Sequence, residues 1–191
     1  MNGLLEAALE FQDFFTQRGW RFCFVGGLAV LRWGRPRATQ DIDIELLTGF
    51  GGEGPYVQAL LGRFRSRLPD AAAFARESRT LLLEASNGVP ADVAFGAVPF
   101  EEKAVERASF FEFLPGVSLR TCSAEDIVVF KAFAARPIDW FDIEGILAKM
   151  GDQLDWDYIL EELRPLCEAK EEPGNVGRLE DLRRNIPGQP D

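Results

Sequence analysis

Apolar residues recur at helical spacing near both ends of the chain. Over residues 3–18 they stand at positions 4, 5, 8, 11 and 15, and Gly19 follows where a helix would end, so we predict an amphipathic helix there. Toward the C-terminus, Ser123 with Asp126 three residues later is typical of a helix N-cap. We therefore predict helices over residues 123–135, 138–149 and 155–168, with Pro137 separating the first from the second.

A strand, a glycine turn and a helix are predicted in succession after the first helix. Residues 21–25 form a short run of β-favouring side chains, Gly26 and Gly27 break it, and an apolar helical pattern resumes over residues 28–33. Residues 41–47 then begin with alternating acidic and aliphatic side chains. This period of two indicates a strand with one buried and one polar face.

Two hairpins and a further helix complete the pattern. Residues 57–68 are predicted as a surface helix with arginines on its polar sides, and residues 79–95 as two strands around an Asn-Gly pair, a strong hairpin signal. Residues 108–122 resemble a second strand pair around Pro-Gly. The predicted fold class is α/β (α+β), a mixed twisted sheet flanked by helices with a helical C-terminal portion.

The predicted elements divide the chain into one principal domain and two further parts. The core covers residues 1–122, and a helical portion over residues 123–170 is expected to pack over the cleft of that core. Residues 171–191 are charged and punctuated by Pro and Gly, so we expect a loosely held tail.

The absence of histidine excludes several kinds of chemistry. With no His among 191 residues, Ser-His-Asp and Cys-His catalysis and His-ligated zinc are ruled out. Three scattered cysteines, without a CxxC pair, indicate neither a disulfide framework nor a zinc site. An enzyme of this composition must use carboxylates, lysines, hydroxyls or hard metal ions.

Charge and hydropathy limit the partners. The formal net charge is -10, and residues 152–191 carry eleven acidic against five basic side chains, which argues against broad, sequence-independent nucleic-acid binding. No apolar run approaches the roughly 20 residues of a membrane span. We expect a cytoplasmic protein without a membrane segment.

Three aspartates form the candidate metal site. Asp41 and Asp43 are two residues apart in a predicted strand and therefore project from one face. Asp92 is the lone acid of the second hairpin strand. Such carboxylates could hold one or two Mg²⁺ that activate a hydroxyl and stabilise a pyrophosphate leaving group. The alternative is the wet face of a half-exposed sheet.

The glycine pair favours the metal site over the alternative of a solvent-exposed sheet face. Gly26 and Gly27 precede a predicted helix, and such a turn allows backbone N–H groups to approach phosphates. The stretch FVGGLAVLRWGRPRATQDIDIEL resembles the signature of polymerase-beta-like nucleotidyltransferases, in which a glycine pair and a helix precede a DxD motif. The resemblance implies an NTP as substrate.

The resemblance narrows to nucleotidyltransferase toxins of the AbiEii/AbiGii type. Arg37, Thr39, Asp41 and Asp43 match the Arg-x-Thr-x-Asp-x-Asp run of that family. The later segment SAEDIVVFKAFAARPIDWFDIEGIL resembles the family's lysine-bearing helix followed by Arg-x-x-Asp-x-x-Asp. The matches cover about residues 24–147.

Lys131 lies beside the apolar face of its predicted helix and needs an anionic partner. The resemblance implies a nucleotide phosphate or an acidic side chain as this partner; the alternative is a snorkelling stem with a solvated head. Asp139 and Asp142 share a helix face, and by resemblance they complete the site or orient Lys131. Their alternative is a favourable interaction with the helix dipole.

The resemblance implies an Mg²⁺-dependent transfer of an NMP from an NTP to an acceptor hydroxyl. In this view Gly26, Gly27, Arg37, Thr39, Lys131 and Asp142 contact the nucleotide, and Asp41, Asp43, Asp92 and Lys131 are catalytic, the three aspartates holding the metal. It also suggests a toxin paired with an antitoxin protein and acting on tRNA or other RNA. A protein or an aminoglycoside-type small molecule as acceptor, and a catalytically silent nucleotide- or partner-binding module, remain open.

Overall fold

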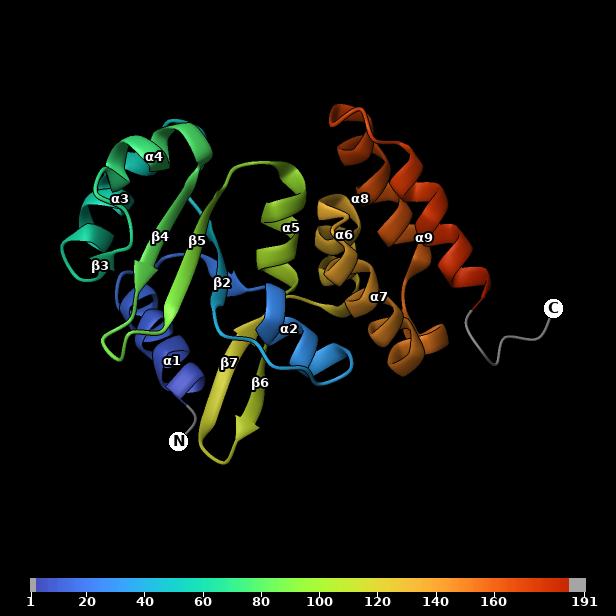
Figure 1. The fold of residues 1–191 in the computed structure, drawn as a ribbon, viewed down its shortest axis with the longest axis horizontal. Coiled ribbons are helices and arrows are strands. Elements are labelled where there is room, and N and C mark those ends of the chain that lie inside the picture. Colours follow the sequence, from blue (N-terminus) through green and yellow to red (C-terminus); the bar gives the residue numbers. More distant parts are fainter. Residues whose placement is uncertain (1–2, 186–191) are drawn as a thin grey trace. The chain divides into compact units, whose positions relative to one another are not determined.

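The computed structural model describes residues 3–185, and within them the strands form one seven-stranded mixed sheet (Figure 1). Its order is β3-β4-β5-β2-β1-β7-β6. The pairs β2–β5 and β1–β7 are parallel, and the other neighbours are antiparallel. The strands are β1 (Phe22–Phe24), β2 (Ile42–Leu47), β3 (Arg65–Ser66), β4 (Thr80–Glu84), β5 (Pro90–Gly96), β6 (Ser109–Leu114) and β7 (Val117–Thr121).

The helices fall before, between and after these strands. They are α1 (Gly3–Thr16), α2 (Gly26–Trp33), α3 (Glu53–Leu61), α4 (Ala71–Ser78), α5 (Pro99–Arg107), α6 (Ala124–Ala134), α7 (Pro137–Met150), α8 (Trp156–Ala169) and α9 (Gly174–Arg184), with a 3₁₀ turn at Gly151–Gln153. None of those between residues 3 and 185 combines the length and apolar character that a membrane span requires.

The chain divides into two compact units. The first, the sheet unit, contains residues up to Leu28 together with Ala38–Cys122. The second, the helical unit, contains Ala29–Arg37 and the described residues 123–185. Residues 29–37, which the sequence-based division assigns to the core, therefore group with the C-terminal helices.

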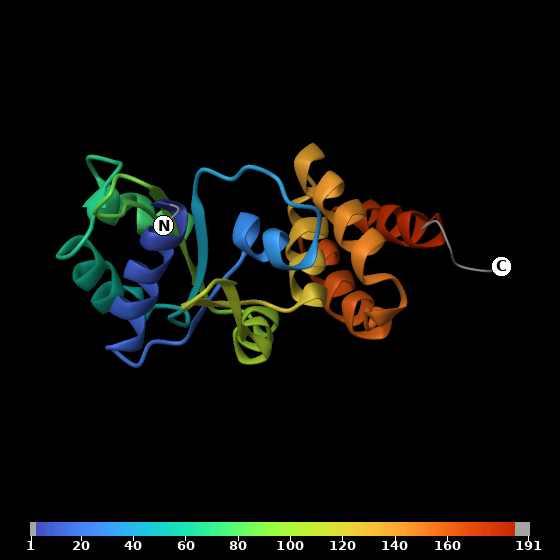
Figure 2. The ribbon, with the colours of Figure 1, turned by 90° about the horizontal axis from the view of Figure 1, so that it is seen from below.

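The two faces of the central strands are covered by different helices. α1 packs on the face that carries Ile44 and Phe22, where Phe15 meets Phe22 at 5.0 Å between ring centroids. The opposite face carries Asp43 and contacts α5. Figure 2 shows α1 and α5 on opposite sides of β2. Burial of apolar side chains on both faces stabilises the sheet.

Most elements that were predicted from local sequence signals are present in the structure. Both hairpins form, β4–β5 and β6–β7, and the predicted Ser123 N-cap is present, with its hydroxyl accepting from the Asp126 N–H at 3.1 Å. All three cysteines are buried, and none of them forms a disulfide within residues 3–185.

The helix predicted over residues 57–68 is wrong in its C-terminal half. α3 ends at Leu61, and Arg65 and Ser66 form β3 beside β4. Phe64 is buried and stacks on Phe11 of α1, with ring centroids 4.1 Å apart. This long-range packing outweighs the helical pattern. Helices α4 and α5 were not predicted.

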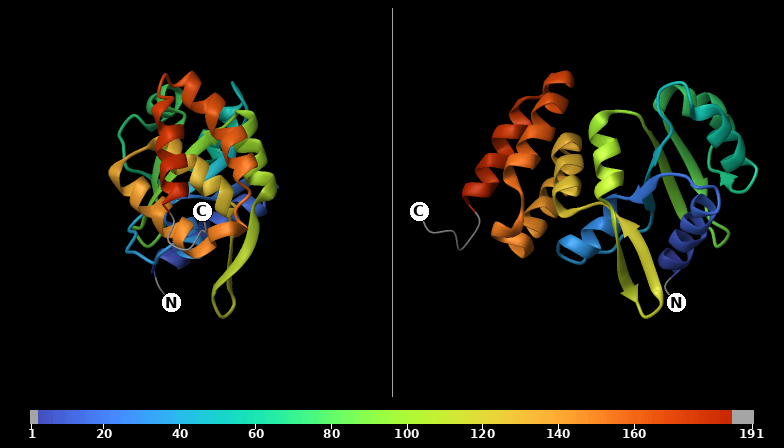
Figure 3. Two further views of the ribbon diagram at one scale, coloured as in Figure 1. Left: turned by 90° about the vertical axis from the view of Figure 1, so that its right-hand side faces the viewer. Right: turned by 180° about the vertical axis from the view of Figure 1, so that it is seen from behind.

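The prediction of a loosely held tail from residue 171 does not hold for Gly174–Arg184, which forms α9. Leu179 is fully buried, Arg178 stacks over Trp140 at 4.3 Å and Arg183 over Trp156 at 4.7 Å. Figure 3 shows α8 and α9 side by side. Residues 186–191 of the expected tail lie outside the described residues.

Candidate functional site

The strand register brings Asp43 and Asp92 together. They are direct partners in the parallel pair β2–β5, so both project from one face of the sheet. Asp41 lies one residue before β2 and is exposed. Burial raises the pKa of Asp92; the Arg67 charge opposes this increase and the Asp41 charge adds to it. The three predicted carboxylates are thus neighbours at one end of the central strands.

The glycine pair lies against these carboxylates. α2 begins at Gly26 itself, so the glycines form its first turn and do not precede it. Gly26 has φ +51°, and a Cβ there would collide with the Asp43 carboxylate. A Cβ on Gly27 would collide with the side chain of Thr39. The first turn of α2, whose backbone N–H groups have no partner inside the helix, therefore borders Asp43 and Thr39.

Thr39 fixes the first aspartate of the motif. Its hydroxyl donates to Asp41 Oδ1 at 3.1 Å. Of the residues predicted to contact nucleotide, Gly26, Gly27 and Thr39 are thus gathered around Asp41 and Asp43.

Glu45 continues the same face of β2 but is buried. It is 4% exposed, and within the described part of the chain its Oε1 has no hydrogen-bond partner. Burial, followed by the nearby Glu101 charge, raises the pKa of Glu45 well above its ordinary value, and the Arg79 charge opposes this. The polar face predicted for residues 41–47 is therefore exposed only at its beginning.

Within the helical unit, Lys131 lies between two buried carboxylates. Its Nζ is 3.0 Å from Asp139 Oδ1 and 2.7 Å from Asp142 Oδ2, and its side chain is 5% exposed. The head is therefore not solvated, and acidic side chains are the partners observed.

Two arginines complete this network. Arg37 donates to both oxygens of Asp142, at 2.7 and 2.8 Å, a bidentate geometry that is strong and specific. Arg136 donates to Asp139 through Nε at 2.7 Å. Although burial acts to raise their pKa values, hydrogen bonds from Arg136 and Lys131 lower the pKa of Asp139, and those from Arg37 and Lys131 lower the pKa of Asp142. The carboxylates are thus held as anions.

No protein-family model and no curated protein sequence matches the chain, but solved structures do. The antibiotic-resistance factor ANT(2'')-Ia superposes with a TM-score of 0.54 and 19% identity, over 94% of this chain and 96% of that one. A nucleotidyltransferase-like antigen from Paracoccidioides brasiliensis gives 0.53 and 13%, over 92% and 90%. Lincomycin-bound LnuA, a lincosamide antibiotic adenylyltransferase, gives 0.50 and 17%, over 76% and 98%.

The chain has a nucleotidyltransferase fold. This finding agrees with the resemblance to the polymerase-beta-like superfamily. None of these three structures is described as an AbiEii/AbiGii toxin, so that narrower assignment stays a prediction.

The donor set of this nucleotidyltransferase fold suits a hard cation. Asp41 and Asp43 supply carboxylate oxygens, which Mg²⁺ prefers, and Mg²⁺ commonly completes its shell with water and substrate phosphates. Among residues 3–185, no three His, Cys, Asp or Glu side chains are grouped as metal ligands would be. The Oδ1 atom of Asp92 is already engaged by Arg67. Asp41 and Asp43 are therefore the candidate ligands for such a cation.

The sequence reasoning missed two partners. Arg67 reaches Asp92 only because β3, β4 and β5 are adjacent in the sheet, and no local sequence signal marks that order. The pairing of Arg37 with Asp142 joins residues 105 positions apart; the two residues were predicted to contact nucleotide, but not each other.

Proposed function

We propose that this protein is an Mg²⁺-dependent nucleotidyltransferase that transfers an NMP from an NTP to an acceptor hydroxyl, releasing pyrophosphate. The observation that carries the proposal is the pairing of Asp43 with Asp92 beside Asp41 and the first turn of α2, within a nucleotidyltransferase fold.

Each residue of this group has a role that follows from its position. Asp41 and Asp43 would hold one or two Mg²⁺, which when bound would neutralise phosphate charge and assist the departure of pyrophosphate. Gly26 and Gly27 present backbone N–H groups toward the phosphates. Asp92 accepts a hydrogen bond from the acceptor hydroxyl and takes its proton as the new P–O bond forms.

A small-molecule acceptor is favoured over RNA. The net charge of -10 opposes binding of a phosphate backbone but attracts a cationic small molecule. Two of the similar structures are an antibiotic-resistance factor and a lincosamide adenylyltransferase. The roles as an RNA-modifying toxin and as the partner of an antitoxin rest on motif resemblance alone.

Transfer of label from α-³²P NTPs tests the proposal. Wild type and Asp43→Asn are incubated with Mg²⁺ and, separately, with aminoglycosides, lincosamides, total RNA and total protein. Asp13→Asn is the matched control, because Asp13 is an exposed aspartate on α1. We expect label in a small molecule with wild type and Asp13→Asn, and a loss of about a hundredfold or more with Asp43→Asn.

The other outcomes separate the alternatives. Label in RNA that depends on Asp43 would favour the toxin hypothesis, and label in protein a protein acceptor. Mg²⁺-dependent NTP binding without transfer to any acceptor would favour a catalytically silent nucleotide-binding module and contradict the proposal.

A further inference from the structure

Arg67, which was not among the predicted site residues, contacts Asp92 of the candidate site. It follows β3, and its Nη2 forms an ion pair with Asp92 Oδ1. The side chains of Arg67 and Asp92 are 28% and 37% exposed. The contact therefore lies in a partly desolvated position, where a charged hydrogen bond is stronger than at an open surface.

The backbone around Arg67 is fixed by hydrogen bonds. The Arg67 N–H donates to the Leu82 carbonyl at 3.0 Å, and Leu82 is the direct β4 partner of Asp92. Beside it, Ser66 Oγ donates to the Leu68 carbonyl at 2.8 Å and lies 3.0 Å from the Leu68 N–H. The Arg67 backbone is thus bonded to β4, the strand beside β5. The Arg67 side chain crosses β4 to reach Asp92 on β5.

The guanidinium of Arg67 does not satisfy all of its donors. Its Nε is buried and has no hydrogen-bond partner among residues 3–185. Leaving a buried donor unpaired is unfavourable, and such groups in folded proteins often mark a function. Arg67 is therefore placed for its contact with Asp92 at the expense of its own hydrogen bonding.

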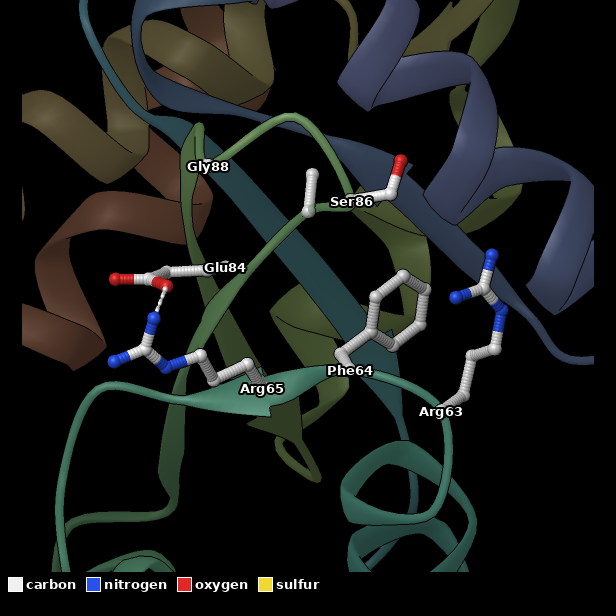
Figure 4. A pocket seen from close by; sticks show the side chains of 7 residues that line it. Arg63, Phe64, Arg65, Glu84, Ser86 and Gly88 are labelled. Carbon is white, nitrogen blue, oxygen red and sulfur yellow. Dashed lines mark ion pairs between the residues drawn. The ribbon is translucent and has the colours of Figure 1, made fainter.

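Arg65 provides a direct comparison within the same segment. Figure 4 shows Arg65 beside Glu84, with Phe64 between Arg65 and Arg63. These residues line a pocket of about 320 Å³. The Arg65–Glu84 pair is longer, at 3.4 Å, and the Arg65 side chain is 82% exposed. An ion pair of this kind contributes little to stability.

We propose that Arg67 is a positioning residue: it holds Oδ1 of Asp92 and so directs the other carboxylate oxygen toward the acceptor hydroxyl. This inference rests on the proposed nucleotidyl transfer. It separates the roles of the three aspartates, because Asp41 and Asp43 serve the nucleotide while Asp92, held by Arg67, serves the acceptor.

Kinetics of five variants test this role, with the acceptor found in the labelling experiment. Arg67→Met should lower kcat by about ten- to a hundredfold with the KM for NTP within about threefold, because a misplaced group affects the reacting geometry. Arg67→Lys should recover part of kcat. The double variant Asp92→Asn with Arg67→Met should have a kcat less than about threefold below that of Asp92→Asn alone, since the two residues act as a unit. Arg65→Met should stay within about twofold of wild type.

Crystal structures of wild type and Arg67→Met supply a readout that needs no acceptor. We expect the Asp92 carboxylate to change rotamer or become disordered in the variant while β4 and β5 are unchanged. An Asp92 carboxylate in the same position in both structures would overturn the inference. So would additive losses of kcat when Arg67→Met and Asp92→Asn are combined. Absence of transfer by wild type would instead count against the proposed function, and the crystallographic comparison would still test the positioning.

Discussion

Gly26 lies directly against the Asp43 carboxylate, at a position where any Cβ would collide with it. Two features favour glycine at this position. The backbone has a φ of +51°, and the Asp43 carboxylate occupies the space that a side chain would need. The same contact places the beginning of α2 beside the DxD motif.

Replacement of Gly26 by Ala should reduce both stability and transfer. Gly19→Ala is the matched control, since Gly19 also has a positive φ, +65°, but its added Cβ would meet no described residue within 4 Å other than its chain neighbours. Backbone strain should cost each variant about 1–2 kcal/mol, and the collision should cost Gly26→Ala about 1–3 kcal/mol more. Urea denaturation measures the difference; equal losses of stability would show that Asp43 moves aside freely.

Thr39 should contribute through its hydroxyl. Thr39→Val keeps the shape but removes the donor to Asp41 Oδ1, and we expect transfer to fall by about tenfold, the equivalent of one hydrogen bond to a charged group. Thr39→Ser retains the donor and should stay near wild type. Equal activity of the two variants would assign Thr39 to packing against Gly27 alone.

Lys131 should be essential for stability. Lys131→Met leaves Asp139 and Asp142 buried with less compensating charge, and removing one partner of a buried ion pair costs about 3–5 kcal/mol. Lys170→Met, which breaks a surface pair with Glu172, should cost at most about 1 kcal/mol.

A double variant separates structure from nucleotide binding at Lys131. Lys131→Met with Asp139→Asn removes one charge of each sign and should regain part of the lost stability. If the KM for NTP then returns to the wild-type value, Lys131 acts on the fold. A KM that stays raised in the stable double variant would support the predicted contact with phosphate.

Stability should depend on pH through Glu45. Because the folded-state pKa is raised above the unfolded value of about 4.3, folding binds a proton at Glu45, and this contribution is present below that pH and lost as pH rises through the folded-state pKa. Glu45→Gln should therefore be more stable than wild type at pH 8, with a smaller difference at pH 4. Glu102→Gln, an exposed control on α5, should match wild type at both pH values.

Asp139 and Asp142 should act in the opposite direction. Their folded-state pKa values are lowered, so their contribution is present above the unfolded value of about 3.9 and is lost as pH falls through the folded-state pKa. Thermal unfolding of wild type below pH 4 should show this loss. A melting temperature that is constant from pH 5 to pH 2 would contradict it.

The sequence by itself determined the elements whose signals are local. The β4–β5 and β6–β7 hairpins follow from short turn sequences between apolar runs, and the start of α6 follows from the Ser123 cap. The alternation at Asp41 and Asp43 also indicated one shared face. Such features depend on neighbours a few residues apart, whose geometry the backbone fixes.

Only the tertiary structure decided which distant residues meet. Asp92 could be matched to Asp43 only through the parallel β2–β5 register, Arg67 to Asp92 through the order of the strands, and β3 replaced a predicted helix end by pairing with β4. Glu45 continues an apparently polar strand face and is nevertheless buried. Strand order and burial depend on the packing of the whole sheet and its helices, and a local pattern carries no information about which element lies on the other side.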